Sequence, residues 1–275
     1  MKKVKLVFVV LTFRNAKDLI DLLKSIEVKV NVSYKVIIIN SYYDELSADE
    51  IKLIADSYDC DFLNVPNKGY GAGNNKGITY AKENYSFNFL IICNPDTVLI
   101  NFDYVNLVNK EGSIIGPEIT SKKGTKQNPF KYFDAKILDL ITYFGFLHNN
   151  IFFVYISIVV NKIIKIFLNS YNNILQKKEH KTYSCHGSFV IFGTNALDKL
   201  GKPYNEKMFL FCEEDHVAKL AKEKKVETII NHSLQIYHKE DGSMNLVSNI
   251  VTSKHLKESY IEFYKYWYKT RLKEL

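Results

Sequence analysis

Short apolar runs alternate with segments of helical spacing over the first hundred residues, and this alternation constrains the fold more than any other feature of the chain. The runs predict buried strands at Val4–Leu11, Val36–Ile39, Asp61–Val65 and Phe89–Cys93. Periodicity and capping signals predict helices at Lys17–Ile26, from Ser47 to Tyr58 with a capping box to Glu50, and at Asn74–Glu83. Such an order is typical of a parallel, doubly wound sheet, in which ligands bind beyond the carboxyl ends of the strands.

The second part of the chain is less regular. We expect a polar loop over Gly112–Asn128 and a long, apolar helical stretch over Ile137–Leu175. Further strands are predicted at Ser184–Phe192, Val226–Ile230 and Leu234–Tyr237. Helices are predicted at Asn195–Leu200, near Glu213–Lys224, and in the tail Val251–Leu275. No repeat or low-complexity linker divides the chain.

Composition narrows the class of protein only in part. The chain has 275 residues, of which 47% are hydrophobic and 24% charged, so it can bury a substantial core. A net charge of +7 favours phosphorylated ligands, nucleic acid or an anionic membrane without choosing among them. The 4 cysteines form no C-x-x-C pair and are expected to be reduced thiols of a cytosolic protein. The apolar run after Lys5 lacks a cleavage site, so we interpret it as a strand instead of a signal peptide.

The densest motif is the glycine loop Asn67–Gly77. It follows the third predicted strand and lacks the third glycine of a dinucleotide fingerprint and the G-K-[ST] of a P-loop. Glycines let the backbone approach another group closely, which serves either a ligand or the packing of a helix on a sheet. We expect Asn74 and Asn75 to begin the following helix, where they can cap it and face a ligand.

Acidic side chains follow one predicted strand and one aromatic, apolar run. Asp96 ends the fourth strand behind Asn94-Pro95, where a carboxylate can hold a divalent metal that bridges two phosphates, or can simply begin a turn. Glu213, Glu214 and Asp215 follow an aromatic run; they suit a general base, a metal site or merely the first turn of a helix. His238 follows a late strand and can complete a Mn²⁺ site or make a structural hydrogen bond.

Taken in this order, the pieces resemble glycosyltransferase family 2, with the GT-A fold, and its bacterial rhamnosyltransferase-like members in particular. The resemblance rests on Val9–Asn15, Asn67–Gly77, Asn94–Asp96, Gly187–Phe189, Phe209–Asp215, and His238 with Gly242-Ser243. It implies an α/β fold with a Rossmann-like, mostly parallel central sheet, flanking helices and additional C-terminal helices. It also implies one catalytic domain, 1–245, with a nucleotide-sugar-binding half (1–97), an acceptor half (98–245) and an apolar helical insertion (137–175). A basic, aromatic tail (246–275) follows.

The resemblance also assigns roles to residues. Donor-binding positions would be Thr12, Arg14, Asn40, Asn67, Gly69, Gly73, Asn74, Lys76, Asn94 and Asp96. Asp96, as the last acid of a D-x-D motif, and His238 would hold Mn²⁺ or Mg²⁺. Glu214 takes the position of the catalytic base, with Glu213 as the second candidate. Two departures stand out: Asn94 replaces an acid of the D-x-D motif, and Asn40 stands near the place of the acid that reads the base.

The implied function is an inverting glycosyltransferase. It would move rhamnose or another hexose from a nucleotide-diphosphate donor to a saccharide or lipid-linked saccharide acceptor in bacterial cell-surface polysaccharide synthesis. One alternative is a non-catalytic module that binds nucleic acid or an anionic membrane, but the basic residues are spread out and we expect no nucleic-acid partner. The other is a metal-dependent nucleotidyltransferase, which needs a basic glycine-rich loop where this chain has Thr12-Phe13-Arg14-Asn15.

Two segments raise the question of a membrane. Within the apolar stretch Ile151–Leu168, Ser157, Asn161 and Lys165 form one narrow polar stripe at i, i+4 spacing, and the two lysines Lys162 and Lys165 argue against a spanning helix. Either this helix belongs to the core or a dimer interface, or it lies in a membrane surface. The tail Tyr260–Lys273 mixes aromatic and basic residues, as suits a headgroup boundary. We expect a cytoplasmic protein, placed at the inner face of the cell membrane if its acceptor is lipid-linked.

Overall fold

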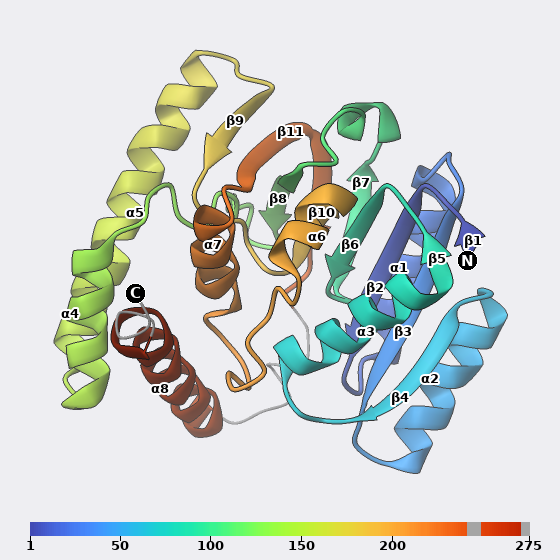
Figure 1. The fold of residues 1–275 in the computed structure, drawn as a ribbon, viewed down its shortest axis with the longest axis horizontal. Coiled ribbons are helices and arrows are strands. Elements are labelled where there is room, and N and C mark those ends of the chain that lie inside the picture. Colours follow the sequence, from blue (N-terminus) through green and yellow to red (C-terminus); the bar gives the residue numbers. More distant parts are fainter. Residues whose placement is uncertain (241–248, 271–275) are drawn as a thin grey trace.

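The computed structural model describes residues 1–240 and 249–270, and its core is one large sheet with helices on both faces (Figure 1). The strand order is β4-β3-β2-β6-β10-β8-β11-β7, with β9 paired to β11 outside this path. The strands are β2 (Leu6–Thr12), β3 (Tyr34–Tyr42), β4 (Asp61–Pro66), β6 (Phe89–Cys93), β7 (Thr97–Asn101), β8 (Ser113–Ser121), β9 (Glu179–Thr182), β10 (Phe189–Gly193) and β11 (Glu227–His238). A separate two-stranded ribbon joins β1 (Lys2–Lys3) to β5 (Tyr85–Ser86).

Different helices cover the two faces of the sheet. They are α1 (Ala16–Lys29), α2 (Glu45–Ser57), α3 (Tyr70–Asn84), α4 (Lys136–Leu147), α5 (Ile151–Ile174), α6 (Thr194–Leu200), α7 (Glu213–Glu223) and α8 (Asn249–Lys265), with short turns η1 (Tyr104–Leu107) and η3 (Tyr266–Thr270). Helices α1 and α2 pack on the face that carries Phe8, whereas α3, α6 and α7 pack on the face that carries Val9. Because side chains alternate along a strand, the apolar run of β2 supplies both core layers.

The sheet is mixed: all strands of its first half are parallel, whereas its second half combines parallel and antiparallel pairs. β4, β3, β2 and β6 run parallel, as the alternation of strands and helices predicts. β10 is antiparallel to β6 and β8, and β11 is parallel to β8 but antiparallel to β7 and β9. Parallel neighbours need a long crossover that brings the chain back to the same edge, and helices α1, α2 and α3 supply these crossovers between β2, β3, β4 and β6. The α/β prediction is therefore confirmed, and its "mostly parallel" sheet is corrected to a mixed one.

Several predicted elements differ in extent. The expected loop Gly112–Asn128 contains strand β8, which is mostly buried but includes Gly116 and Pro117, two residues that are unfavourable in strands. The two late strands are a single strand β11 whose register shifts between Asn231 and Gln235. The long apolar helix is two helices, because the chain reverses at 148–150. The strand predicted to start at Ser184 starts at Phe189.

Two helix starts also lie earlier than predicted. Helix α2 begins at Glu45, because the Asp44 side chain accepts a hydrogen bond from the Ser47 N–H and takes the capping role expected of Ser47. Helix α3 begins at Tyr70, so the glycines lie in its first turns, and Asn74 and Asn75 do not cap it. Glycine is a poor helix former, so propensity alone placed the start too late.

The C-terminal helix packs against the insertion. Tyr260, Phe263 and Tyr264 are buried in a cluster with Tyr143 of α4 and Met208. The tail rings therefore fill the protein interior instead of a membrane headgroup region, which corrects our interpretation of this segment. Arg271 and Lys273 of the tail, Gly242 and Ser243, and the predicted boundary between 245 and 246 lie outside the described residues.

Helix α3 approaches the sheet closely, because it presents glycines to it. A Cβ at Gly77 would lie 2.3 Å from Cγ1 of Val9 and 3.2 Å from Cγ1 of Ile39. Both neighbours are β-branched and wholly buried, so they cannot rotate away at low cost. The glycines of the loop thus serve close helix–sheet packing, one of the two roles expected of them.

We predict that Gly77→Ala lowers the free energy of unfolding by about 1–3 kcal/mol, because the added methyl overpacks the α3–β2 contact. Gly112→Ala is the control, since a Cβ added there would meet no atom within 4 Å, and it should change stability by less than about 0.5 kcal/mol. Chemical denaturation of the two variants and the wild type gives the comparison. Equal stability of the two variants would contradict the packing argument.

Candidate functional site

The carboxyl ends of β2 and β3 form one wall of the candidate site. Thr12 and Asn40 lie there, as predicted, and both are buried. The Thr12 hydroxyl lies 3.3 Å from Oδ1 of Asn40, whose amide nitrogen donates to Oδ1 of Asn64 at 2.9 Å. These polar groups satisfy one another, so they hold the wall in one arrangement before any ligand arrives.

Arg14 lies on the loop after β2. Its backbone has a φ of 58°, and its guanidinium carbon lies 4.0 Å from the centroid of the Tyr43 ring. The side chain is exposed. A guanidinium held against an aromatic face keeps the N–H donors at its edge available for other partners.

The start of α3 contacts the segment that precedes α7. Gly69 has a φ of 97°, and a Cβ there would lie 2.3 Å from the carbonyl oxygen of Phe209. The Tyr70 N–H donates to that same carbonyl at 2.8 Å, while Oδ1 of Asn67 accepts from the Gly69 N–H at 3.2 Å. Gly69 is therefore required by both its backbone conformation and the close approach of another stretch of chain.

The two asparagines of the loop have different surroundings. Asn75 donates to the Tyr204 carbonyl at 2.9 Å and contacts Glu206, so it links α3 to the loop before α7. Asn74 is wholly buried, yet neither polar atom of its side chain has a partner within the protein. An unpaired buried amide costs about 1–3 kcal/mol, and such groups concentrate at sites that await a ligand or water. Lys76 is exposed and, after Lys202 and Asn75, contributes to lowering the pKa of Glu206.

Asp96 and His238 lie together, although 142 residues separate them in sequence. Nε2 of His238 is 3.4 Å from Oδ2 of Asp96. The pairing of β11 with β7 sets this position, since His238 lies opposite Thr97 and the Lys239 N–H donates to the Asp96 carbonyl at 2.9 Å. Oε1 of Gln127 lies 2.8 Å from Nδ1 of His238. A partner on one ring nitrogen orients a histidine so that the other nitrogen is free to bind a metal.

These donors suit a small metal site completed by the substrate. Within residues 1–240 and 249–270, no group of three or more His, Cys, Asp or Glu side chains could hold a metal ion. One carboxylate and one imidazole still agree with a Mg²⁺ or Mn²⁺ ion that takes its remaining ligands from water and phosphate oxygens. The pair Asp96–His238 therefore fits the expected ion only when a diphosphate is bound with it.

Tyr70 connects the two halves of the site. Its hydroxyl lies 3.2 Å from Oδ1 of Asn94 and 2.9 Å from the carbonyl oxygen of Gly187. Asn94 also donates its backbone N–H to the Ser188 carbonyl at 2.8 Å. The Asn94 side chain, predicted to contact the donor, is thus used at least in part to tie β6 to the segment before β10.

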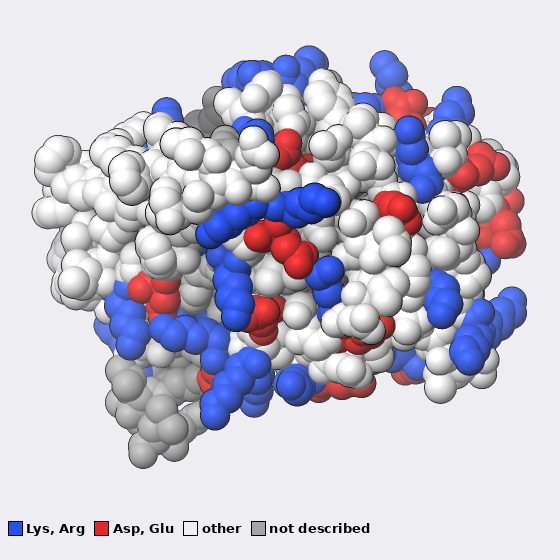
Figure 2. Space-filling view, turned by 90° about the horizontal axis from the view of Figure 1, so that it is seen from above, with Lys and Arg blue, Asp and Glu red and all other residues white. Residues whose placement is uncertain are grey.

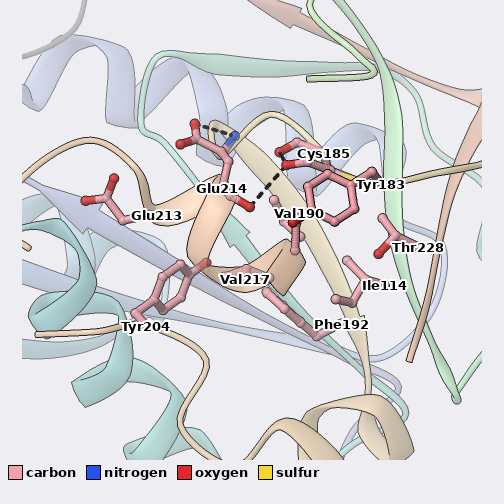
Figure 3. A pocket seen from close by; sticks show the side chains of 13 residues that line it. Ile114, Tyr183, Cys185, Val190, Phe192, Tyr204, Glu213, Glu214, Val217 and Thr228 are labelled. Atoms are coloured by element: carbon pink, nitrogen blue, oxygen red, sulfur yellow. Dashed lines mark hydrogen bonds between the residues drawn. The ribbon is translucent and has the colours of Figure 1, made fainter. Parts of the chain in front are cut away.

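Glu213 and Glu214 begin α7 and point in different directions. Phe211 and Cys212, directly before them, both have positive φ values of 76° and 69°. Such backbone costs of order 1–3 kcal/mol per residue and persists where the surrounding structure enforces it, often at functional sites. Oε1 of Glu214 accepts from the Gly187 N–H at 3.1 Å, whereas Oε1 of Glu213 is buried and has no partner (Figure 3).

The two carboxyl groups differ in accessibility and in hydrogen-bond partners. Burial, and then the neighbouring Glu214, raise the pKa of Glu213 to about 8, so Glu213 is mostly protonated at neutral pH. Burial also raises the pKa of Glu214, but the Gly187 N–H stabilises its ionised form. Asp215 is paired with Lys131 at 2.6 Å. Among the three acids, Glu214 is the one that is both partly accessible and hydrogen-bonded as a carboxylate.

A small cavity lies behind the two glutamates, between β10 and α7. Apolar side chains such as Val190, Phe192 and Val217 line much of it (Figure 3). Its volume of about 20 Å³ has room for one water and not for a sugar. Substrate must therefore approach from the open side of Glu214, not through this cavity.

Four residues of the site were not predicted from the sequence: Tyr70, Gln127, Lys131 and His186. The His186 ring lies 5.7 Å from that of His238, and burial with the nearby His238 lowers the pKa of His186 to about 3, which keeps it neutral. His186 directly precedes Gly187-Ser188, and Tyr70 lies inside the glycine motif. Both therefore lie in or beside a motif from which the sequence could have identified them. Gln127 and Lys131 had no local signal, because their partners lie 111 and 84 residues away.

The fold, once established, can be compared with known proteins. No family model and no curated protein matches the sequence. Among solved structures, GalNAc-T7 with UDP, GalNAc and Mn²⁺ is similar with a TM-score of 0.62 and 10% identity, covering 97% of this chain and 48% of that one. S. aureus TarS is similar with a TM-score of 0.54 and 10% identity, covering 97% and 44%. Both are glycosyltransferases of the GT-A type, and this chain spans about half the length of each.

The pH dependence of stability tests the charge state of Glu213. A pKa raised from 4.5 to about 8 means that Glu213 stabilises the fold fully below pH 4.5 and loses this contribution as the pH rises through 8. The free energy of unfolding should therefore fall more steeply between pH 5 and 8 in the wild type than in Glu213→Gln. The difference in slope should approach, at most, about 1.4 kcal/mol per pH unit. Urea denaturation at several pH values measures it, and parallel curves would contradict the prediction.

Proposed function

We propose that this protein is an inverting glycosyltransferase that uses a nucleotide-sugar donor. The observation that carries the proposal is the chain of contacts from Asp96–His238 through Asn94, Tyr70 and Gly187 to Glu214. It brings the residues proposed to hold phosphate and metal and the residue proposed as the base along the same edge of one sheet. A GT-A fold supports the proposal as well, since the two similar structures are both glycosyltransferases.

The donor would lie over the carboxyl ends of β2, β3 and β6. In this arrangement Thr12, Asn40 and Asn67 border the nucleotide, Arg14 contacts the diphosphate, and the unpaired amide of Asn74 gains a partner. Lys76 would act on the phosphates only through its long, exposed side chain. Gly73 keeps α3 close to Leu11 of the sheet, and Gly69 keeps its start close to Phe209 before α7.

A divalent ion, Mn²⁺ or Mg²⁺, would be held by Asp96 and His238 together with the diphosphate. When bound, it would neutralise charge on the leaving nucleoside diphosphate. The protein's own contribution is to orient His238 through Gln127 and to hold the Asp96 carboxylate beside it. The similar GalNAc-T7 structure contains UDP and Mn²⁺, which is in keeping with this proposal.

Glu214 would be the general base. Its carboxylate, oriented by the Gly187 N–H, would take the proton from an acceptor hydroxyl, which then attacks the anomeric carbon. A single displacement from the face opposite the leaving group inverts the anomeric configuration. Glu213 is less suited to this role, because it is protonated at neutral pH and more deeply buried.

The substrates follow from the same resemblance. We propose rhamnose or another hexose as the transferred sugar and a saccharide or lipid-linked saccharide as the acceptor. The setting would be cell-surface polysaccharide synthesis in a bacterium, with the enzyme in the cytoplasm or at the inner face of the membrane. A thermal-shift screen of nucleotide sugars with Mn²⁺ tests the donor class, because a bound donor stabilises the fold by mass action.

Glu214→Gln should lower the rate of sugar transfer by about 10²–10⁴-fold, because it removes the base and keeps the shape of the side chain. Donor affinity should change little. Single-turnover assays with the donor identified by the screen, alongside calorimetry, separate the two effects. Glu27→Gln, an exposed acid on α1, is the control and should leave both unchanged. Near-normal turnover in Glu214→Gln would overturn the assignment of the base.

Asp96→Ala should abolish the part of donor affinity that depends on Mn²⁺, because one of the two protein ligands is lost. Calorimetric titrations with and without Mn²⁺ measure this difference directly. Asp49→Ala, an exposed acid on α2, serves as the control. Identical isotherms for wild type and Asp96→Ala would remove Asp96 from the metal and donor site.

A further inference from the structure

Helix α5 turns its polar side toward the protein, the reverse of an ordinary surface helix. Its polar stripe faces the protein: the Ser157 hydroxyl donates to the Leu138 carbonyl at 3.1 Å, Asn161 donates to the Phe130 carbonyl at 3.3 Å, and Lys165 donates to the Gln127 carbonyl at 2.9 Å. Burial of Lys165 lowers its pKa to about 8. Surface helices normally bury their apolar side and expose their polar side. Here the hydrogen bonds fix the reverse orientation.

The outward side of α4 and α5 is consequently apolar. Its exposed large side chains, which we call the apolar face, include Ile137, Phe144, Phe152, Ile158, Ile163 and Phe167. Ile151–Asn172 is long and apolar enough to cross a membrane by length and composition, and only 6% of that stretch is buried in the protein. In Figure 2 the end of the molecule formed by α4 and α5 is a broad surface with almost no charged side chain. Contiguous apolar surface on this scale marks an interaction site.

Charge distinguishes the kinds of partner. Helix α5 contains no acidic residue, and the one acid of α4, Asp139, is buried and accepts from the Tyr268 hydroxyl at 2.6 Å. The exposed charges of α4 and α5 are the lysines Lys136 and Lys162, and Lys177 and Lys178 follow α5; the next residue, Glu179, is paired with Lys110 at 3.4 Å. A two-fold dimer would bring this face against itself and set lysines near lysines without any acid in α4 or α5 to pair them. An anionic lipid surface supplies both an apolar layer and the opposite charge.

We propose that the apolar face of α4 and α5 is a docking surface for an anionic lipid bilayer, with α5 lying in the plane of the membrane interface. The helix has 24 residues and is about 36 Å long, so it can bury one side along its whole length. A spanning arrangement is disfavoured, because the polar stripe of α5 is bonded to the rest of the protein. The inference does not depend on the proposed sugar transfer, although a membrane-held acceptor would suit it.

Vesicle flotation of the full-length protein tests the proposal. Wild type should float with vesicles that contain phosphatidylglycerol, and less with pure phosphatidylcholine. The double variant Ile163→Gln/Phe167→Gln should weaken binding roughly tenfold or more, since both side chains would leave the lipid. The control is Leu46→Gln/Leu53→Gln on α2, where the leucines are 84% and 71% exposed and lie outside the apolar face; it should float like wild type. Circular dichroism melts confirm that the variants fold.

Three results would overturn the proposal. Wild type that floats with neither kind of vesicle would show that the face does not bind lipid. Equal loss of binding in both double variants would show that the apolar face has no special role. A dimeric wild type that the Ile163→Gln/Phe167→Gln variant converts to a monomer would make the face an interface between copies. Donor binding should be the same in all variants, so failure here is distinct from failure of the proposed activity.

Discussion

The antiparallel pairing of β10 with β6 is the contact on which the candidate site depends. It sets Phe189 opposite Cys93, so that the segment before β10 passes beside Asn94 at the end of β6. Ser188 then accepts from the Asn94 N–H, and Gly187 lies between Tyr70 and Glu214. A parallel strand in this position would carry its preceding segment to the opposite edge of the sheet. The direction of one strand therefore decides whether Glu214 and the Asp96–His238 pair share an edge.

Close backbone contacts also fix the conformation of the sheet edge that carries the candidate site. Gly69 lets α3 touch the Phe209 carbonyl, and the positive φ values of Phe211 and Cys212 aim the start of α7 at Gly187. Behind α7, Asp215 is bonded to Lys131. This buried pair fixes the first turn of α7 from the side away from the substrate, and breaking such a pair leaves an uncompensated charge in the interior. Strain at the front of α7 is thus offset by packing and charge pairing behind it.

The helical insertion joins this region to the surface of the molecule. Asp139 of α4 is bonded to Tyr268 of the tail, whose neighbour Trp267 donates to His216 of α7 at 3.0 Å. Of the tail aromatics that suggested a headgroup boundary, Tyr264 is buried, and Tyr266, Trp267 and Tyr268 are half-buried against the rest of the protein. The apolar side chains that face outward belong to α4 and α5 instead. Both segments were identified as unusual by composition, but composition does not state which side of a helix is covered.

The sequence by itself determined the parallel half of the sheet, the order of the motifs and most of the candidate residues, because periodicity and turn chemistry are local properties. Only the tertiary structure decided that Asp96 meets His238, that Glu214 is held by Gly187, and that Gln127 and Lys131 support them. It also decided the mixed strand directions and the inward orientation of the Ser157–Lys165 stripe. These features depend on contacts between distant segments, and no local pattern records which segments will pack together.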